Sequence, residues 1–366
     1  MTCPMVRPSV GKDMSPYTAK VFRNNIVCLE VFLLQSYGMN DHYELIIIGA
    51  GPSGIACAIE AEKAGLSYIV LEKGFLANSI YNFPTNMTFF STSERLEIGK
   101  VPFISHTEKP TRKEALEYYR RIVESYGLKI RYQTEINTLE KSADLCFHLK
   151  TTKGKVFKAD YVIAATGYYD VPRLLHVEGE DLPKVKHYYD DAHPYIGMKV
   201  LVVGAANSAC DVALETWQKG ANVSMAVRSS ELYQNVKYWI LPNIENRINE
   251  GSIKAYFNSE VKKISPDTVT IETPDGTIEI ENDYVLAMTG YKPDYNFLAK
   301  LGVQFDGSEA QRPLFNESTL ESNVEGLYLA GVILAGLNTS KLFIENTRDH
   351  GKKIIEHIRY KTRANA

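Results

Sequence analysis

Two segments of the chain share one pattern of hydrophobic and small residues. In residues 43–73 the apolar run YELIII is followed by the turn GAGPSG, the helical stretch IACAIEAEKAG and the apolar run SYIVLEK. In residues 199–228 the same order appears as KVLVVG, AANSACDVALETWQKG and ANVSMAVR. Because the apolar runs are continuous, they are typical of strands buried on both faces of a parallel sheet. Each segment therefore predicts a strand–helix–strand unit.

A second repeat supports an internal duplication. DYVIAATGYYDVP (160–172) and DYVLAMTGYKPD (283–294) share the form Asp-Tyr-Val-x-Ala-x-Thr-Gly-Tyr, and each predicts a strand that ends in a tight Thr-Gly turn. We therefore predict an α/β protein with two Rossmann-like dinucleotide-binding domains.

Length and charge narrow the class of protein. The 366 residues suffice for two domains and carry a net charge of −3. Since there is no basic surplus, we expect neither nucleic acid nor an anionic membrane as a partner. No apolar run approaches ~18 residues, so a membrane span is not expected. Residues 1–38 fit a signal peptide poorly, and we expect them to be an upstream extension before a natural start at Met39.

The cysteines point to a reducing compartment. Their number is odd, and none forms a close pair of the redox or zinc type. We therefore expect a cytoplasmic protein with buried thiols, and no metal site, because His, Cys and carboxylates do not cluster at ligand spacing. The five cysteines are Cys3, Cys28, Cys57, Cys146 and Cys210.

The turn GAGPSG has the residues that a dinucleotide site requires. Gly49 permits the tight turn, Gly51 lets the backbone approach a pyrophosphate, and Gly54 lets helix and strand pack closely. The following helix offers free N–H groups to the phosphates. Glu72, 18 residues after Gly54, is placed to accept from ribose hydroxyls.

The second turn, GAANSA, differs in two ways. Gly204 is kept, but Ala206 and Ala209 take the other two glycine positions. The strand that follows leads to Arg228 rather than to an acid, which favours the 2′-phosphate of NADP over NAD. Two such sites imply electron transfer, because a nicotinamide brings a hydride that a flavin accepts. The residues alone do not separate FAD from a second NAD at the first site.

Six further stretches carry a resemblance to a known family. They are NSIYNFPTNMTFFSTSERLEIG (78–99), AATGYYDVP, VKHYYDDAHPYI (185–196), YWILPNIENRINEGSI (238–253), LAMTGYKPD and GLYLAGVILAGLNTSKLFIENTRDHG (326–351). From about residue 43 to 358 the chain resembles the bacillithiol disulfide reductase family. That resemblance implies a thioredoxin-reductase-like fold, FAD, NADPH, and reduction of a low-molecular-weight thiol disulfide as the small-molecule electron acceptor.

The resemblance also implies domain boundaries and cofactor contacts. The FAD domain would comprise residues 39–176 and 291–366, with an NADPH domain inserted at 177–290, and a homo-oligomer is compatible with this arrangement. The stretch IENTRDHG would lie as a helix under the isoalloxazine. The FAD contacts would be Gly49, Gly51, Pro52, Ser53, Gly54, Glu72, Lys73, Asn78, Ser79, Thr166, Gly167, Gly331 and Val332, and the NADPH contacts Gly204, Asn207, Ser208 and Arg228.

One position departs from the family. Better-known members carry cysteine in the turn as Gly-x-Gly-Pro-Cys-Gly, where this chain has Ser53, and a hydroxyl cannot form a mixed disulfide. Cys57, one helical turn on, is a weak substitute candidate, and Cys210 lies in the equivalent helix of the second unit. We expect both to be inert core residues. The catalytic residues therefore stay unknown, with His187 and His193 as candidate proton donors that are more often surface or hinge residues.

Two alternative functions stay open. Flavin monooxygenases also pair an FAD site with a GxxNSA site, but their Phe-x-Gly-x-x-x-His-x-x-x-aromatic fingerprint matches this chain only at His187. The other alternative is a non-enzymatic protein that holds FAD and NADPH and senses redox state, which the missing cysteine keeps open.

Overall fold

The computed structural model describes residues 42–142 and 146–364. The chain divides into two units, Met1–His42 and Tyr43–Ala366, and of the first the structure describes only His42, which begins strand β1. The extension predicted for residues 1–38 lies outside the described residues, as do Cys3 and Cys28.

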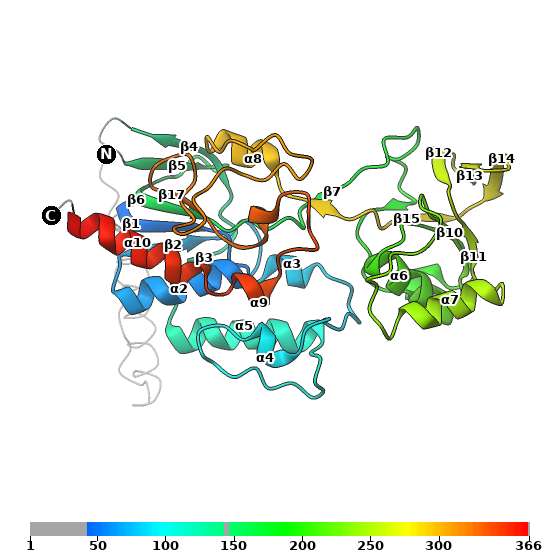
Figure 1. The fold of residues 1–366 in the computed structure, drawn as a ribbon, viewed down its shortest axis with the longest axis horizontal. Coiled ribbons are helices and arrows are strands. Elements are labelled where there is room, and N and C mark those ends of the chain that lie inside the picture. Colours follow the sequence, from blue (N-terminus) through cyan, green and yellow to red (C-terminus); the bar gives the residue numbers. More distant parts are fainter. Residues whose placement is uncertain (1–41, 143–145, 365–366) are drawn as a thin grey trace, which may run out of the picture. The chain divides into compact units, whose positions relative to one another are not determined.

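The first predicted unit forms part of a seven-stranded mixed sheet with the order β3-β2-β1-β6-β5-β4, in which β17 also pairs with β6 (Figure 1). The pairs β1–β2, β2–β3 and β6–β17 are parallel, whereas β4, β5 and β6 form an antiparallel meander. Its strands are β1 (His42–Ile48), β2 (Tyr68–Leu71), β3 (Ile130–Arg131), β4 (Ile136–Lys141), β5 (Phe147–Thr151), β6 (Val156–Ala164) and β17 (Leu327–Leu329).

Helices α2 (Pro52–Ala64) and α10 (His350–Ala364) lie side by side next to this sheet (Figure 1). A Cβ at Gly351 would lie 2.8 Å from the Cα of Cys57, so the two helices approach this closely because residue 351 is glycine. The stretch expected as one helix over IENTRDHG is two elements, since α9 (Ile344–Thr347) ends before α10 begins. The other helices here are α3 (Asn78–Tyr81), α4 (Ser93–Leu96), α5 (Arg112–Tyr126), α8 (Tyr295–Lys300) and the 3-10 turn η2 (Gly331–Ala335).

The second predicted unit forms a five-stranded parallel sheet with the order β11-β10-β9-β15-β8. Helices α6 (Asn207–Gln218) and α7 (Leu241–Asn249) pack in one hydrophobic cluster with this sheet, and a three-stranded antiparallel sheet contributes to another. The strands are β8 (Val185–Lys186), β9 (Lys199–Val203), β10 (Asn222–Ala226), β11 (Lys254–Tyr256), β12 (Glu260–Ile264), β13 (Thr268–Thr273), β14 (Gly276–Glu281) and β15 (Tyr284–Ala287), with a 3-10 turn η1 (His193–Tyr195).

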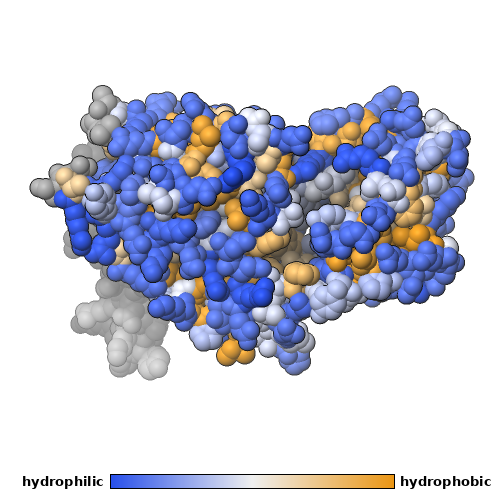
Figure 2. All heavy atoms as spheres, viewed as in Figure 1, coloured by the Kyte–Doolittle hydropathy of each residue, from blue (hydrophilic) through white to orange (hydrophobic). Residues whose placement is uncertain are grey.

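Both Thr-Gly-Tyr repeats end in a short antiparallel pair. Strand β7 (Val171–Pro172) pairs with β16 (Tyr291–Lys292), and here the chain passes from one large sheet to the other and back. The predicted domain boundaries at 176 and 290 lie close to this pair. Charged and polar residues cover most of the face drawn in Figure 2, and hydrophobic residues form smaller groups on it. Among the described residues no helix is long and apolar enough to cross a membrane.

Candidate cofactor cleft

A cleft of about 850 Å³ is lined by residues of both predicted nucleotide units. Fourteen of the seventeen residues expected to contact cofactors line it, although they come from five separate parts of the chain. The three that do not line it are Gly54, Gly204 and Arg228.

The first glycine turn has the geometry that its sequence predicts. Gly49 has a φ of +106°, and a Cβ there would lie 2.6 Å from the carbonyl oxygen of Ala165. A Cβ at Gly54 would lie 1.9 Å from the carbonyl oxygen of Gly49. Gly51 precedes α2 and has no side chain to cap it, so the first N–H groups of the helix remain available to an anion.

Glu72 follows β2, and its side chain accepts a hydrogen bond from the backbone of the first glycine turn. Its Oε2 accepts the N–H of Ala50 at 2.7 Å, and its Oε1 accepts the N–H of Gly74 at 2.7 Å. Burial raises the pKa of Glu72, and these two donors oppose that shift. A carboxylate has about four acceptor positions, so two remain for a ribose hydroxyl. The predicted acid is therefore part of the cleft wall and also supports its backbone.

Polar side chains line the cleft beside the first glycine turn. The buried Oγ1 of Thr166 has no hydrogen-bond partner among the described residues, although such groups are normally bonded. Lys73 pairs with Asp170 at 2.9 Å on the same wall. Asn78 and Ser79 line the cleft beside them. An unpartnered hydroxyl next to an open glycine turn fits a bound dinucleotide.

The floor of the cleft brings together distant segments. The Oγ of Ser53 lies 3.2 Å from the Oγ1 of Thr347 in α9, and a Cβ at Gly331 would lie 2.7 Å from that same Ser53 oxygen. Gly331 and Val332 line the cleft beside Ser53. The residue that replaces the family's cysteine therefore lies at the cleft surface, in contact with the turn at Gly331.

The second glycine turn repeats the backbone approach of the first. Gly204 has a φ of +137°, and a Cβ there would lie 2.6 Å from the carbonyl oxygen of Met288. Asn207 and Ser208, at the start of α6, line the cleft. Arg228 is exposed and lies two residues beyond the end of β10, outside the cleft lining.

Lys237 was not predicted from the sequence. Its buried ammonium donates to Asp211 at 2.8 Å and to the carbonyl of Thr88 at 3.2 Å, and its backbone N–H donates to the side chain of Asn207 at 2.8 Å. A nearby bond joins Asn86 to Glu215 at 2.7 Å. Lys237 gave no sequence signal, because one lysine in a loop has no periodicity and no motif.

Comparison with known proteins places the chain in a family. The family model described as pyridine nucleotide-disulphide oxidoreductase matches residues 46–331. The chain belongs to this family. It is 45% identical over 314 residues to the bacilliredoxin reductase Bdr of Bacillus subtilis (strain 168), covering 86% of this chain and 96% of that protein. The predicted resemblance and the prediction of an oxidoreductase are thereby confirmed.

Solved structures of this pyridine nucleotide-disulphide oxidoreductase fold agree. The bacillithiol disulfide reductase Bdr (YpdA) from Staphylococcus aureus superposes with a TM-score of 0.85 at 44% identity, covering 87% of this chain and 99% of that one. A thioredoxin reductase from T. acidophilum, at 20% identity and a TM-score of 0.69, shares the fold over 88% of this chain and 99% of that one. The predicted thioredoxin-reductase-like fold is confirmed. Membership of the family implies that the chain binds a flavin and a pyridine nucleotide.

The cysteines bear on how such a reductase could work here. Cys57 is fully buried, and burial raises the pKa of its thiol to about 12, with a further contribution from Glu60. Burial likewise raises the pKa of Cys210 to about 12. Of the cysteines that the structure describes, none lines the cleft.

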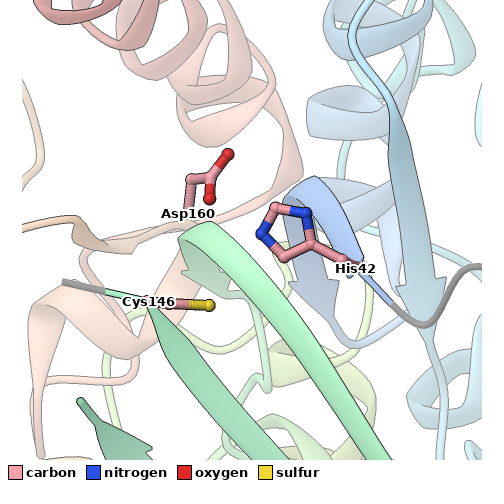
Figure 3. A group of neighbouring side chains, drawn as sticks. All are labelled: His42, Cys146 and Asp160. Carbon is pink, nitrogen blue, oxygen red and sulfur yellow. The ribbon is translucent and has the colours of Figure 1, made fainter. Parts of the chain in front are cut away.

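Two other groups of titratable residues lie away from the cleft. The Nε2 of His187 is 3.4 Å from Glu180, and neither His187 nor the exposed His193 lines the cleft. The possible ligand atoms of His42, Cys146 and Asp160 lie within 4.8 Å of one another (Figure 3). Their sequence separation explains why spacing did not predict this group. Each of the three already has an interaction partner, so the group is not a set of free ligands.

Proposed function

We propose that this protein is an NADPH-dependent FAD oxidoreductase that reduces a low-molecular-weight disulfide of the bacillithiol type. The observation that supports it most is one cleft that reaches both glycine-rich turns, so that two dinucleotides could meet within it. The high similarity to bacilliredoxin and bacillithiol disulfide reductases supports the class of acceptor.

The two cofactors are assigned to different ends of the cleft. FAD would lie along the first turn, with its pyrophosphate at Gly51 and the start of α2, its ribose at Glu72, and its flavin end near Ser53 and Gly331. NADPH would lie along the start of α6 at Asn207 and Ser208. In this assignment residues 39–176 and 291–366 form the FAD domain, and residues 177–290 form the NADPH domain.

The choice of NADPH over NADH rests on Arg228. It follows β10 at the end where a Rossmann unit contacts the adenosine ribose, and it is exposed and free to meet a phosphate. The first unit has the buried Glu72 at the corresponding strand end, where a 2′-phosphate would be repelled. The cation therefore favours the phosphorylated nucleotide at the second site only.

When bound, the nicotinamide and the flavin supply the hydride-transfer chemistry. The chain orients the two cofactors and keeps water from the space between them. In the overall reaction NADPH, a proton and a disulfide give NADP⁺ and two thiols. Ser53 cannot form a mixed disulfide, and no described cysteine lines the cleft, so in this proposal the protein holds the acceptor by non-covalent contacts. We therefore infer that none of the described thiols, Cys57, Cys146 and Cys210, relays the electrons.

The experiment is a two-stage assay of the purified protein. The released cofactor is first identified by chromatography, and flavin reduction by NADPH is followed by stopped-flow absorbance. The reduced protein is then mixed with bacillithiol disulfide, glutathione disulfide and cystine. We expect FAD, rapid reduction by NADPH, and reoxidation fastest with one of these disulfides. Colourless protein contradicts the whole proposal, whereas reoxidation by oxygen with incorporation into an organic substrate would make the protein a monooxygenase.

The proposed reaction also sets the surroundings in which the enzyme acts. Its products are thiols and its donor is NADPH, so it requires a reducing compartment, and we place it in the cytoplasm. The electron acceptor is a small molecule that enters the cleft.

A further inference from the structure

We propose that His350 is a positioning residue for the flavin site: from behind the cleft wall it holds the turn at Gly331 in the conformation that the flavin needs. This inference rests on the proposed function, because it takes the surface at Ser53 and Gly331 to be the flavin end of the cleft. His350 itself does not line the cleft.

The turn at Gly331 is a constrained part of the wall. Gly331 has a φ of +86°, which side-chain-bearing residues rarely adopt, and it follows the buried strand β17. Its missing Cβ makes room for Ser53, since a Cβ there would lie 2.9 Å from the Cβ of Ser53. A small displacement of this turn would therefore change the cleft surface next to Ser53.

One buried hydrogen bond fixes this turn from behind. The N–H of Gly331 donates to the Nδ1 of His350 at 3.1 Å, and the His350 residue is 9% exposed. The next residue, Gly351, packs closely against Cys57 of α2, which fixes the start of α10 beside this bond. Thr347, three residues before His350, bonds to Ser53. The segment 347–351 thus connects the start of α2 to the turn at Gly331.

The bond requires neutral imidazole. Nδ1 accepts only when the ring carries its proton on Nε2, and a protonated ring has no acceptor. Burial lowers the pKa of His350 to about 4, with Lys353 acting in the same direction and Asp349 opposing. The other charged groups that line a cavity together with His350 are Arg312, Glu317 and Lys341.

The sign of the pH effect follows from that shift. In the unfolded chain His350 takes up a proton near its ordinary pKa of 6.5. In the folded chain its pKa is lowered to about 4, so it takes up the proton only at lower pH. As the pH falls through this window, the unfolded state binds more protons than the folded state, so the stabilisation by this contact is lost progressively. Above pH 6.5 it is fully present.

The test compares two substitutions at one position in the full-length protein. His350→Asn keeps an acceptor oxygen close to where Nδ1 lies, whereas His350→Leu removes it and leaves the N–H of Gly331 buried without a partner. We expect the flavin dissociation constant to rise about 10- to 100-fold in His350→Leu and to stay within about 3-fold of wild type in His350→Asn. The flavin absorption spectrum should shift in His350→Leu only.

His357→Leu is the matched control. His357 lies on the same helix α10 and its Nδ1 is 2.9 Å from the hydroxyl of Tyr328, away from the cleft. This variant should lower thermal stability while flavin affinity and spectrum stay as in wild type. Equal effects of His350→Leu and His357→Leu on flavin affinity would overturn the positioning role, as would equal loss in His350→Asn and His350→Leu.

A pH series decides the question if His350→Leu does not fold. Flavin retention by the folded wild type should decline as the pH falls through about 4, where His350 gains its proton, and it should decline more steeply than retention by His350→Asn, which has no proton to gain. Coincident curves would overturn the proposal. Flavin retention is measured without any acceptor, so this result is independent of whether the acceptor is a disulfide.

Discussion

In both nucleotide units the first glycine of the turn approaches a neighbouring carbonyl equally closely, but other residues of the two sites differ in size and charge. A Cβ at Gly49 would meet the carbonyl of Ala165 at 2.6 Å, and a Cβ at Gly204 would meet the carbonyl of Met288 at 2.6 Å. In both units the contacted carbonyl belongs to the residue before the Thr-Gly turn. The duplication therefore preserved the contact between the glycine turn and the neighbouring strand.

The two units differ at the third glycine position of the turn and at the residue that follows the second strand of each unit. A Cβ at Gly54 has no room, whereas the equivalent position of the second unit holds Ala209, whose side chain is a methyl group. The first unit has a buried acid at its strand end, and the second has an exposed cation. In the proposed assignment, the first site would enclose its nucleotide and the second would contact its nucleotide through an exposed cation.

The largest effect on stability and flavin binding should come from exchanging glycine and alanine at the third position of the two turns. Gly54→Ala places a methyl group 1.9 Å from the carbonyl of Gly49, so the turn must move. We expect unfolding free energy to fall by about 1–3 kcal/mol, as for overpacked cores, and flavin to be lost. The reciprocal substitution Ala209→Gly should lower the free energy of unfolding by only about 1 kcal/mol. Urea unfolding and flavin content measure the effects of both substitutions. Equal losses of unfolding free energy in the two variants would contradict the difference between the two units.

Gly51→Val should separate binding from folding. Among the described residues no atom lies within 4 Å of a Cβ at Gly51, and its φ of −75° suits any residue. The branched side chain would fill the space of the pyrophosphate, so we expect a folded, colourless protein. Circular dichroism should match the wild type. Yellow Gly51→Val protein would show that the flavin does not use this turn.

Arg228→Ala tests the second site. Loss of one charged hydrogen bond is worth about 1.5–3 kcal/mol, so the preference for NADPH over NADH should fall about 10- to 100-fold. The ratio of kcat/KM values for the two nucleotides measures this preference. NADH turnover should hardly change, because the lost contact is to the 2′-phosphate. Equal use of both nucleotides by the wild type would refute the role of Arg228.

The smallest effect is expected at the equivalent helix cysteines of the two units. Cys57→Ser and Cys210→Ser, singly and together, should leave flavin reduction and turnover within a few-fold of wild type, because both thiols are buried with a pKa near 12. Alkylation of the reduced enzyme should not stop turnover. Loss of turnover in Cys57→Ser with FAD still bound would mean that the redox thiol lies one helical turn after Ser53.

The repeated units could be predicted from sequence because they are local. A strand, a turn and a helix within thirty residues leave a pattern of apolar runs and glycines, and Gly49, Glu72 and Gly204 take the expected places. Lys237, Thr347 and His350 left no such pattern. Each acts through tertiary contacts with segments distant in the chain, and contacts of that kind have no period. The group of His42, Cys146 and Asp160 escaped prediction for the same reason.

The close packing of Gly351 against Cys57 makes that thiol a reporter of helix opening. Because Cys57 is fully buried, a reagent can reach its thiol only when the packing around α2 and α10 opens, so its labelling rate depends on how often this region opens. The ratio of this rate to that of a free thiol gives the opening equilibrium directly, as amide exchange does for backbone groups. Measured with and without flavin, the same ratio would give the free energy with which the cofactor closes the two helices.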